Sequence, residues 1–378
     1  MFRRNVCYVT GSRADFGLMV STLRQLNAHP AISLSILVTG MHLGVDFGLT
    51  IKDVEDEGFR IVARVECDMS KNTASQMAKN IGTMLCGFVD QWEKERPDLV
   101  LLLGDRGEML AGAIAATHLG IPVAHIHGGE RSGTIDEPVR HAISKLAHLH
   151  LVASEDARDR LVGMGELSER IVVVGAPGLD GIKSMVSYDR NTLSKREGFD
   201  DTSKIALFIF HPVLHDMLDA GEQARCILKA LLDSNFKVLA LMPNADAGNH
   251  QIAEVLRSFE RMGSVVIKTH LPRNEFISWM ACVDIMVGNS SSGVIEAATF
   301  GTNVINVGTR QNMRLRNPNV IDVPVDRDSI IDALHSLRSS KKGVCVNLYG
   351  DGQAGKRIVD YLIGVTLNDN LLVKCNAY

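Results

Sequence analysis

The form of the apolar segments is the strongest constraint on the fold of this chain. Short runs rich in Val, Ile and Leu, such as Val6–Val9, Leu34–Val38 and Leu99–Leu103, alternate with longer segments of helical period. This alternation predicts parallel β-α-β units. Because the runs are apolar almost throughout, we expect helices to cover both faces of the sheet. The sequence therefore predicts an α/β protein with a doubly wound sheet.

The pattern occurs in two series, separated by a polar stretch between Pro177 and Lys204. The first series adds strands near Val123–Ile126 and Val172–Val174. The second predicts strands near Ile205–Phe210, Val238–Met242, Val265–Lys268, Ile285–Val287 and Val304–Asn306, and helices near Gln223–Asp233, Asn274–Cys282 and Ser291–Phe300. Two similar halves predict two doubly wound, Rossmann-like domains that face each other across a cleft. We expect residues 1–177 and 178–355 to form them, and residues 356–378 to form a C-terminal helix and tail that pack back on the first domain.

Composition excludes several classes of function. Hydrophobic residues at 46% and charged residues at 22% are typical of a globular protein. A net charge of -4 does not indicate a nucleic-acid or anionic-membrane partner. No apolar run approaches the roughly 20 residues that cross a bilayer. The first residues, Met1–Asn5, lead directly into a strand pattern without an apolar signal segment, so we expect a cytoplasmic protein.

The cysteines do not indicate a disulfide framework or a zinc site. Their number, 7, is odd, they are scattered along the chain, and no C-x-x-C pair occurs. We interpret them as reduced residues that mostly pack in the interior. Nothing in the sequence requires a metal or a redox cofactor.

In doubly wound folds, ligands bind beyond the carboxyl ends of the strands. The first strand is followed by the turn Thr10–Gly17, where Arg13 is suited to bind a phosphate through two donors. The alternative is an ordinary strand-to-helix turn in which Asp15 caps the helix. The turn lacks G-x-G-x-x-G, so no dinucleotide fingerprint is present. Asp105, after Leu99–Leu103, is a helix cap or an acid or base.

The segment His125–Asp136 is dense in titratable groups. It holds His125, His127, Glu130 and Asp136 together with glycines, where a predicted strand ends. Such a loop packs poorly and is suited to proton transfer. A metal site is less favoured, because no third and fourth ligand accompany the H-x-H spacing. Histidines further along the chain are interpreted as structural, namely His141, His148 and His150.

In the second half, the segment Gly288–Gly293 follows an apolar strand and opens a helix. Small residues, free N–H groups and the positive end of a helix attract phosphate, although a Ser-capped helix is the simpler alternative. Glu296 is placed to accept hydrogen bonds from ribose, and Arg310 to neutralise a diphosphate. His211 follows another strand end, where capping or core packing is the alternative role. Together these residues predict an anionic nucleotide on the second domain and a reacting sugar at the acids of the first.

Taken jointly, these segments resemble the UDP-N-acetylglucosamine 2-epimerases, and among them the hydrolysing branch of sialic-acid-type biosynthesis. The matching segments are Thr10–Gly17, Val38–Leu43, Gly104–Arg106, His125–His141, His211–Val213, Lys268–Pro272 with Phe276, Gly288–Ser291 with Glu296, and Asn306–Gln311. They extend over most of the chain. None would be specific alone.

The resemblance implies a glycosyltransferase-B-like fold with two domains. It also implies UDP-sugar as substrate, UDP as product, no cofactor, and a homodimer. For the substrate-binding residues it implies UDP against Ser290, Ser291, Glu296 and Arg310, phosphates near Arg13, uracil near Leu271 and Phe276, and further substrate contacts at Asp15, His42 and Arg106.

The reaction implied by the resemblance is elimination of UDP to a glycal, followed by hydration with inversion at C2. Asp105, Asp136 and His211 match catalytic positions of the family, and Glu130 is retained. His127 departs from the pattern, because several family members carry a carboxylate there. A histidine, with an ordinary pKa near ~6.5, still serves as an acid or base at neutral pH. It also fits a variant substrate.

The first hypothesis is therefore a hydrolysing epimerase that converts UDP-N-acetylglucosamine and water into N-acetylmannosamine and UDP. The alternative substrate is UDP-2,4-diacetamido-2,4,6-trideoxyhexose, of the legionaminic-acid route. A non-hydrolysing epimerase, a UDP-sugar glycosyltransferase and a non-catalytic UDP-sugar sensor remain as further alternatives. The joint presence of Asp105, Asp136 and His211 disfavours the sensor.

Overall fold

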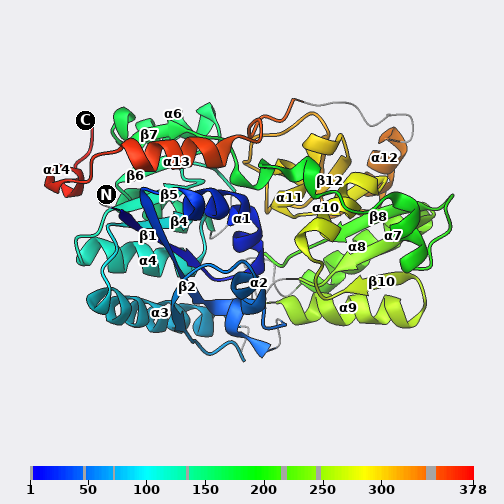
Figure 1. The fold of residues 1–378 in the computed structure, drawn as a ribbon. Coiled ribbons are helices and arrows are strands. Elements are labelled where there is room, and N and C mark those ends of the chain that lie inside the picture. Colours follow the sequence, from blue (N-terminus) through cyan, green and yellow to red (C-terminus); the bar gives the residue numbers. More distant parts are fainter. Residues whose placement is uncertain are drawn as a thin grey trace. The chain divides into compact units, whose positions relative to one another are not determined.

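The computed structural model describes residues 3–45, 48–70, 73–132, 136–213, 219–243, 248–337 and 346–378. These residues form two compact units, each built on a parallel sheet (Figure 1). Unit 1 comprises the described residues of 1–130, 135–180 and 349–378, and unit 2 those of 131–134 and 181–348. Unit 2 begins its long segment at Gly181 and the chain returns to unit 1 at Tyr349, whereas the sequence-based boundaries lie after residues 177 and 355.

Unit 1 contains a sheet with strand order β3-β2-β1-β4-β5-β6-β7. Its strands are β1 (Arg4–Thr10), β2 (Ile32–Thr39), β3 (Ile61–Val65), β4 (Leu99–Leu103), β5 (Val123–Ile126), β6 (Leu149–Val152) and β7 (Ile171–Val173). Every pairing is parallel, and Tyr8 of β1 is in register with Ile36 of β2 and Leu101 of β4. The order reverses between β1 and β4, and ligands of such sheets bind at this switch point.

Alternate residues of the strands in unit 1 enter two separate cores. Val6 and Tyr8 pack with α1 and α13, whereas Cys7 and Val9 pack with α3 and α4. The helices of unit 1 are α1 (Arg13–Ala28), α2 (Ile51–Asp56), α3 (Ala74–Lys94), α4 (Gly107–His118), α5 (Asp136–Leu146), α6 (Glu155–Gly163), α13 (Ala354–Gly364) and α14 (Asp369–Leu372). Burial on both faces explains why the strand segments are apolar throughout, since each buried aliphatic side chain contributes about 1.5–3 kcal/mol.

Unit 2 repeats the arrangement with the strand order β10-β9-β8-β11-β12-β13. Its strands are β8 (Lys204–Ile209), β9 (Phe236–Leu241), β10 (Val265–Lys268), β11 (Ile285–Gly288), β12 (Asn303–Val307) and β13 (Val320–Val323). Its helices are α7 (Arg190–Arg196), α8 (Ala220–Asp233), α9 (Asn249–Arg261), α10 (Arg273–Cys282), α11 (Ser291–Ile295) and α12 (Arg327–Ser336). Phe208 packs with α8 and α9, and Leu207 packs on the opposite face with α10. The switch point of unit 2 lies between β8 and β11.

The structure confirms the predicted α/β class and two parallel, doubly wound sheets, and every strand predicted from an apolar run is present. The prediction of one helix near Ser291–Phe300 is wrong. Helix α11 ends at Ile295, and a tighter 3₁₀ turn follows over Ala297–Phe300. Gly301, with φ +65°, ends the segment, and last turns before such a stop often tighten in this way.

Two negative findings concern the described residues. None of their helices combines the length and apolar character needed to cross a membrane. Cys7, Cys67, Cys86, Cys226, Cys282 and Cys375 are all free thiols. Cys345 lies outside the described residues.

Candidate active site

The turn after β1 is organised by Asp15. Ser12 is the N-cap of α1, and Asp15 completes a capping box with it. The Asp15 carboxylate accepts hydrogen bonds from the backbone N–H groups of Gly11, at 3.0 Å, and Ser12, at 3.1 Å. Burial raises the pKa of Asp15 to about 7, against the opposing effect of hydrogen bonds from Thr10 and Gly11. The structure therefore places Asp15 as the cap that shapes this turn.

His42 lies behind this turn, in the short 3₁₀ segment Gly40–Leu43 that follows β2. Its Nε2 is 3.0 Å from Thr10 Oγ1 and its Nδ1 is 2.8 Å from Thr50 Oγ1. Burial lowers the pKa of His42 to about 4, so the ring is neutral at pH 7. Both ring nitrogens are used inside unit 1, and His42 connects the segments that end β1 and begin α2.

Arg13 occupies the first residue of α1 and has one donor to spare. Its Nε donates to Asp53 Oδ2 at 2.5 Å. Its Nη1 is buried and has no hydrogen-bond partner among the described residues. An unpaired buried guanidinium N–H is costly, and an anion would satisfy it.

Glycine allows the ends of β1 and β2 to approach α4 closely. A Cβ atom on Gly11 would lie 2.4 Å from Glu108 Oε1. Gly40 has φ +59°, and its Cβ would lie 2.9 Å from the carbonyl oxygen of Gly11. Glu108 in turn accepts a hydrogen bond from Arg106 Nε at 3.1 Å. The packing at the switch point thus holds Arg106 at the N-terminus of α4.

Arg140 joins two loops at the carboxyl edge of the sheet. It lies on α5 and is only 1% exposed. Its Nη2 forms an ion pair with Asp105, which follows β4, and its Nη1 donates to the carbonyl oxygen of Glu130 at 2.9 Å. One buried guanidinium therefore positions Asp105 and the Glu130 segment together.

His127 and Glu130 form a buried pair after β5, the strand that neighbours β4, which Asp105 follows. Nδ1 of His127 is hydrogen bonded to Oε1 of Glu130, and both side chains are at most 10% exposed. His127 has φ +62°, a left-handed conformation that residues other than glycine seldom adopt. Strained backbone of this kind clusters at functional sites. An imidazole bonded to a carboxylate is an arrangement suited to proton transfer.

Asp136 and His125 occupy different environments from this pair. Asp136 is half-buried in the first turn of α5, four residues before Arg140. His125 is fully buried, with Nε2 2.7 Å from the carbonyl oxygen of Gly104 and Nδ1 3.1 Å from Ser144 Oγ. Burial lowers the pKa of His125 to about 3, so its ring is neutral. His125 is therefore a structural link, although it belongs to the titratable segment that the sequence singles out.

In unit 2, Asn289 locks the two loops at the switch point. Its Oδ1 accepts from the N–H of His211 and its Nδ2 donates to the carbonyl oxygen of His211, both at 2.8 Å. The preceding Gly288 has φ +138°, and a Cβ there would lie 1.9 Å from the carbonyl oxygen of Ile209. The sequence pattern places Gly288 and Asn289 in a phosphate-binding segment and does not predict this clamp. The clamp fixes the backbone of His211, two residues after the end of β8.

The serines and Arg310 lie around the same clamp. Ser290 is the N-cap of α11, its Oγ is 2.8 Å from Ser292 Oγ, and Ser291 is the first helical residue. Arg310 Nη1 donates to the carbonyl oxygen of Asn289 at 3.2 Å. Backbone N–H groups, hydroxyls and a guanidinium thus occur together, as a diphosphate site requires.

Glu296 is paired with a residue that sequence analysis missed. Arg273 Nη2 lies 2.7 Å from Glu296 Oε2, and Glu296 is 4% exposed. The Arg273 guanidinium carbon also lies 5.9 Å from the ring centroid of Phe276. Leu271 is buried in the same core, against which Phe276 packs. Arg273 thereby brings the Glu296 carboxylate and the Phe276 ring to one place. The signal in the sequence that could have identified Arg273 is its position as a basic residue at the start of α10.

A cavity of about 390 Å³ also opens in unit 2, lined by residues that include Phe210, Asn289, Val307 and Thr309. The predicted substrate-binding residues of unit 2 are not part of its lining. Among the described residues, no cluster of three or more His, Cys, Asp or Glu side chains is arranged to hold a metal ion.

Comparisons with known proteins agree with this arrangement. The family model for UDP-N-acetylglucosamine 2-epimerase matches residues 24–363. A UDP-N,N'-diacetylbacillosamine 2-epimerase (hydrolyzing) of Legionella pneumophila is 48% identical over 99% of this chain and 100% of its own length. A UDP-N-acetylglucosamine 2-epimerase of Neisseria meningitidis serogroup B is 33% identical over 90% and 89%.

Solved structures show the same fold at low identity. The UDP-GlcNAc 2-epimerase from Neisseria meningitidis, solved with UDP-GlcNAc bound, gives a TM-score of 0.80 at 21% identity and covers 95% of this chain and 99% of its own. The enzyme from Methanocaldococcus jannaschii, in complex with UDP-GlcNAc and UDP, gives 0.81 at 18% identity over 95% and 99%. This likeness confirms the predicted glycosyltransferase-B-like class of the two units.

Proposed function

The chain belongs to the UDP-N-acetylglucosamine 2-epimerase family, in its hydrolysing branch, and from this premise we propose that its substrate is UDP-N,N'-diacetylbacillosamine. This sugar is a 2,4-diacetamido-2,4,6-trideoxyhexose. The products are UDP and the free sugar inverted at C2. The support for this substrate is the identity of 48% to the Legionella relative, over nearly all of both chains.

UDP-N-acetylglucosamine, the first hypothesis from the sequence, becomes the second candidate. It is supported by the family model and by the Neisseria relative at 33% identity. The order of the two candidates is reversed because the diacetylbacillosamine relative is more similar. His127, which departs from the family pattern, fits such a change of substrate.

The reaction has two steps, and each moves a proton. In the first, a base removes the proton on C2, the C1–O bond to UDP breaks, and a C1=C2 double bond forms. In the second, the oxygen of water adds to C1 and a proton is delivered to C2 from the opposite face. Because the proton leaves one face and arrives at the other, the site needs more than one acid or base.

Unit 1 supplies the acids and bases in this proposal. The observation that carries the assignment is the buried His127–Glu130 pair. The guanidinium of Arg140 donates to the backbone carbonyl of Glu130 and also pairs with Asp105. Asp136 begins the helix that carries this guanidinium. We assign these four side chains jointly to the removal and return of the C2 proton and to the activation of water. General acid–base groups of this kind contribute about 10²–10⁴-fold each.

Unit 2 supplies the nucleotide contacts. Ser290, Ser291 and Arg310 are assigned to the diphosphate and Glu296 to the ribose. Leu271 and Phe276 are assigned to uracil. The support is the cluster of donors at the start of α11 and the Arg273–Glu296 pair beside Phe276.

Two further side chains are assigned to the phosphates. Arg13 is assigned because its Nη1 is buried without a partner among the described residues. His211 is assigned to the departing phosphate as an acid. Its support is the Asn289 clamp, which fixes its backbone at the end of β8.

A direct test is incubation of the purified protein with each UDP-sugar in D₂O, followed by proton NMR. We expect free UDP and a C2-deuterated, C2-inverted sugar, with kcat/KM at least about tenfold higher for the diacetamido substrate. Preference for UDP-N-acetylglucosamine would establish the second candidate. Epimerised sugar still attached to UDP, or no deuterium at C2, would contradict the proposed reaction.

A further inference from the structure

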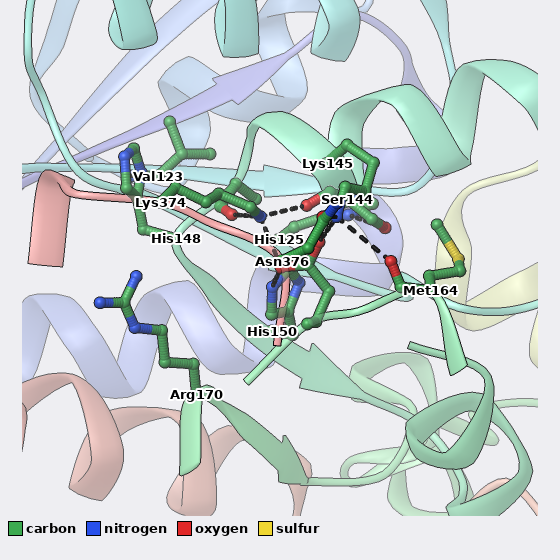
Figure 2. A network of polar contacts seen from close by, with 12 residues as sticks. Val123, His125, Ser144, Lys145, His148, His150, Met164, Arg170, Lys374 and Asn376 are labelled. Carbon is green, nitrogen blue, oxygen red and sulfur yellow. Dashed lines mark hydrogen bonds and ion pairs between the residues drawn. The ribbon is translucent and has the colours of Figure 1, made fainter. Parts of the chain in front are cut away.

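The C-terminal tail that follows α14 joins a buried charge cluster in unit 1 (Figure 2). Glu166, between α6 and β7, is 4% exposed and lies at its centre. Its carboxylate is 2.7 Å from Lys145 Nζ, 2.9 Å from His150 Nε2 and 2.6 Å from Lys374 Nζ. Lys374 belongs to the tail, more than 200 residues beyond its partner in the sequence. The tail is therefore anchored to unit 1 by charge, at a buried carboxylate.

Lys374 also binds the end of α5. Its Nζ donates to the carbonyl oxygen of Ser144 at 2.9 Å and to that of Ala147. Helix α5 ends at Leu146, and the last carbonyl groups of a helix have no partner within it. A cation at this end satisfies them and complements the helix dipole. Lys374 thus acts as a C-terminal cap supplied by a distant segment.

Ser144 extends this contact to the loop of Asp105. The His125 ring is neutral, and its Nε2 faces the carbonyl oxygen of Gly104, which only accepts. Nε2 therefore carries the proton, and Nδ1 accepts a hydrogen bond from the hydroxyl of Ser144 at 3.1 Å. Gly104 directly precedes Asp105. The chain of contacts runs from Lys374 through Ser144 and His125 to the residue before Asp105.

The same helix reaches Asp105 by a second route. Arg140 lies one turn before Ser144 on α5 and holds the carboxylate of Asp105. A shift of α5 along its axis would therefore disturb both the backbone before Asp105 and its ion pair. Helix α5 is fixed at its C-terminal end by Lys374, where Figure 2 shows Lys374, Ser144 and His125 close together.

We propose that Lys374 is a positioning residue for the reaction, which sets the place of Asp105 through α5 and the Ser144–His125 link. The inference rests on the proposed function, because it takes Asp105 as a group that acts on the sugar. Lys374 itself does not touch substrate. A displacement of about 1 Å at a reacting group costs up to 10²-fold in rate, so an effect of about tenfold is expected from a loosened helix.

The test compares Lys374→Met with Lys374→Arg, which keeps the charge, and with Lys356→Met, an exposed lysine on α13. We expect Lys374→Met to lower kcat about tenfold, with KM and UDP affinity within about twofold of wild type. Lys374→Arg recovers most of the loss, and Lys356→Met changes nothing. Assays are run well below each variant's unfolding temperature. An unchanged kcat in Lys374→Met, with only a lower unfolding temperature, would overturn the proposal.

A second readout is independent of catalysis. Hydrogen–deuterium exchange, followed by mass spectrometry, reports on the peptide that covers 136–146. We expect faster exchange there in Lys374→Met and unchanged exchange in α3, and no difference in α5 would also overturn the proposal. If wild-type protein turned over neither UDP-sugar, the proposed function would fail, while the exchange result would still decide whether Lys374 fixes α5.

Discussion

The six strands of unit 2 repeat the order of the first six strands of unit 1, but the two units hold the carboxyl edges of their sheets by different chemistry. In unit 1 the edge is held by buried charged groups, namely the Arg140–Asp105 ion pair and the neighbouring His127–Glu130 pair. In unit 2 the comparable position is held by the neutral amide of Asn289, which clamps His211, and by Gly288. The switch points are therefore equivalent in topology, but an ion pair links the loops of unit 1 and a neutral amide links those of unit 2.

The difference fits the proposed division of roles, in which unit 1 moves the protons of the sugar while unit 2 holds the nucleotide and adds His211 as the acid for the departing phosphate. A buried ion pair contributes little net stability, because the cost of removing ions from water offsets their attraction. Stability alone thus explains the charged edge of unit 1 poorly, whereas an acid–base reaction needs titratable groups. A neutral amide keeps its geometry at any pH, which suits a loop that presents donors to a nucleotide. Substitutions at each edge test this difference.

The largest effect is expected from Glu130→Gln in unit 1. The amide preserves the size of the side chain but removes the carboxylate that pairs with His127. We expect kcat to fall about 10²–10³-fold while UDP affinity stays close to wild type. Steady-state kinetics and UDP titration measure both quantities, with Glu155→Gln, an exposed residue of α6, as the control for charge. Turnover within twofold of wild type would remove the pair from the mechanism.

The next effect concerns stability in unit 2. Gly288→Ala places a Cβ 1.9 Å from the carbonyl oxygen of Ile209, at a φ of +138° that alanine rarely adopts. We expect the free energy of unfolding to fall by about 3 kcal/mol or more, and UDP binding to weaken with it. Gly82→Ala is the control, since a Cβ there meets nothing within 4 Å, and it should be neutral or slightly stabilising. Equal stability of the two variants in a denaturant titration would contradict the close approach of Gly288 to Ile209.

A smaller effect is expected from pH. Burial alone would raise the pKa of Glu166, but hydrogen bonds from His150, Lys145 and Lys374 outweigh it and lower the pKa to about 2. A carboxyl whose pKa is lower in the folded than in the unfolded state stabilises the fold above its unfolded pKa, near 4.5, and loses this contribution as pH falls towards 2.

Between pH 5 and pH 3, the free energy of unfolding of the wild-type protein should therefore fall by about 2 kcal/mol more than that of Glu166→Gln. Denaturant unfolding at both pH values measures the difference. Glu169→Gln, an exposed neighbour, should follow wild type. Identical pH dependence in wild type and Glu166→Gln would show that the cluster does not hold unit 1 in this way.

The predictable part of the fold follows from burial. Strands such as β4, Leu99–Leu103, are buried at every residue and are visible as apolar runs. The sequence did not indicate β3, Ile61–Val65, because it contains Arg64 and none of its residues is fully buried. Strand β13, Val320–Val323, was missed for the same reason, since Asp322 is exposed.

The positions of the candidate site residues could be predicted from the sequence, but the partners with which they pair could not. Strand ends meet at one edge of a parallel sheet, so Asp105, Glu130 and Ser290 were identified from their place in the pattern. The partners were not, because Arg140 is 35 residues from Asp105 and Asn289 is 78 residues from His211. Only the folded chain brings these groups together. The individual roles of Asp136 and His127, and the homodimer, stay predictions.

The most direct measurement is a crossed comparison of Asp105→Asn and Arg310→Met, each titrated with UDP by calorimetry and assayed for turnover. We expect Asp105→Asn to lower kcat about 10³-fold with UDP affinity unchanged, and Arg310→Met to weaken UDP binding at least about tenfold. Thermal unfolding confirms that both variants are folded. If Asp105→Asn instead weakened UDP binding as strongly as Arg310→Met and kept its kcat at saturating substrate, the division of proton transfer and nucleotide binding between the two units would be wrong.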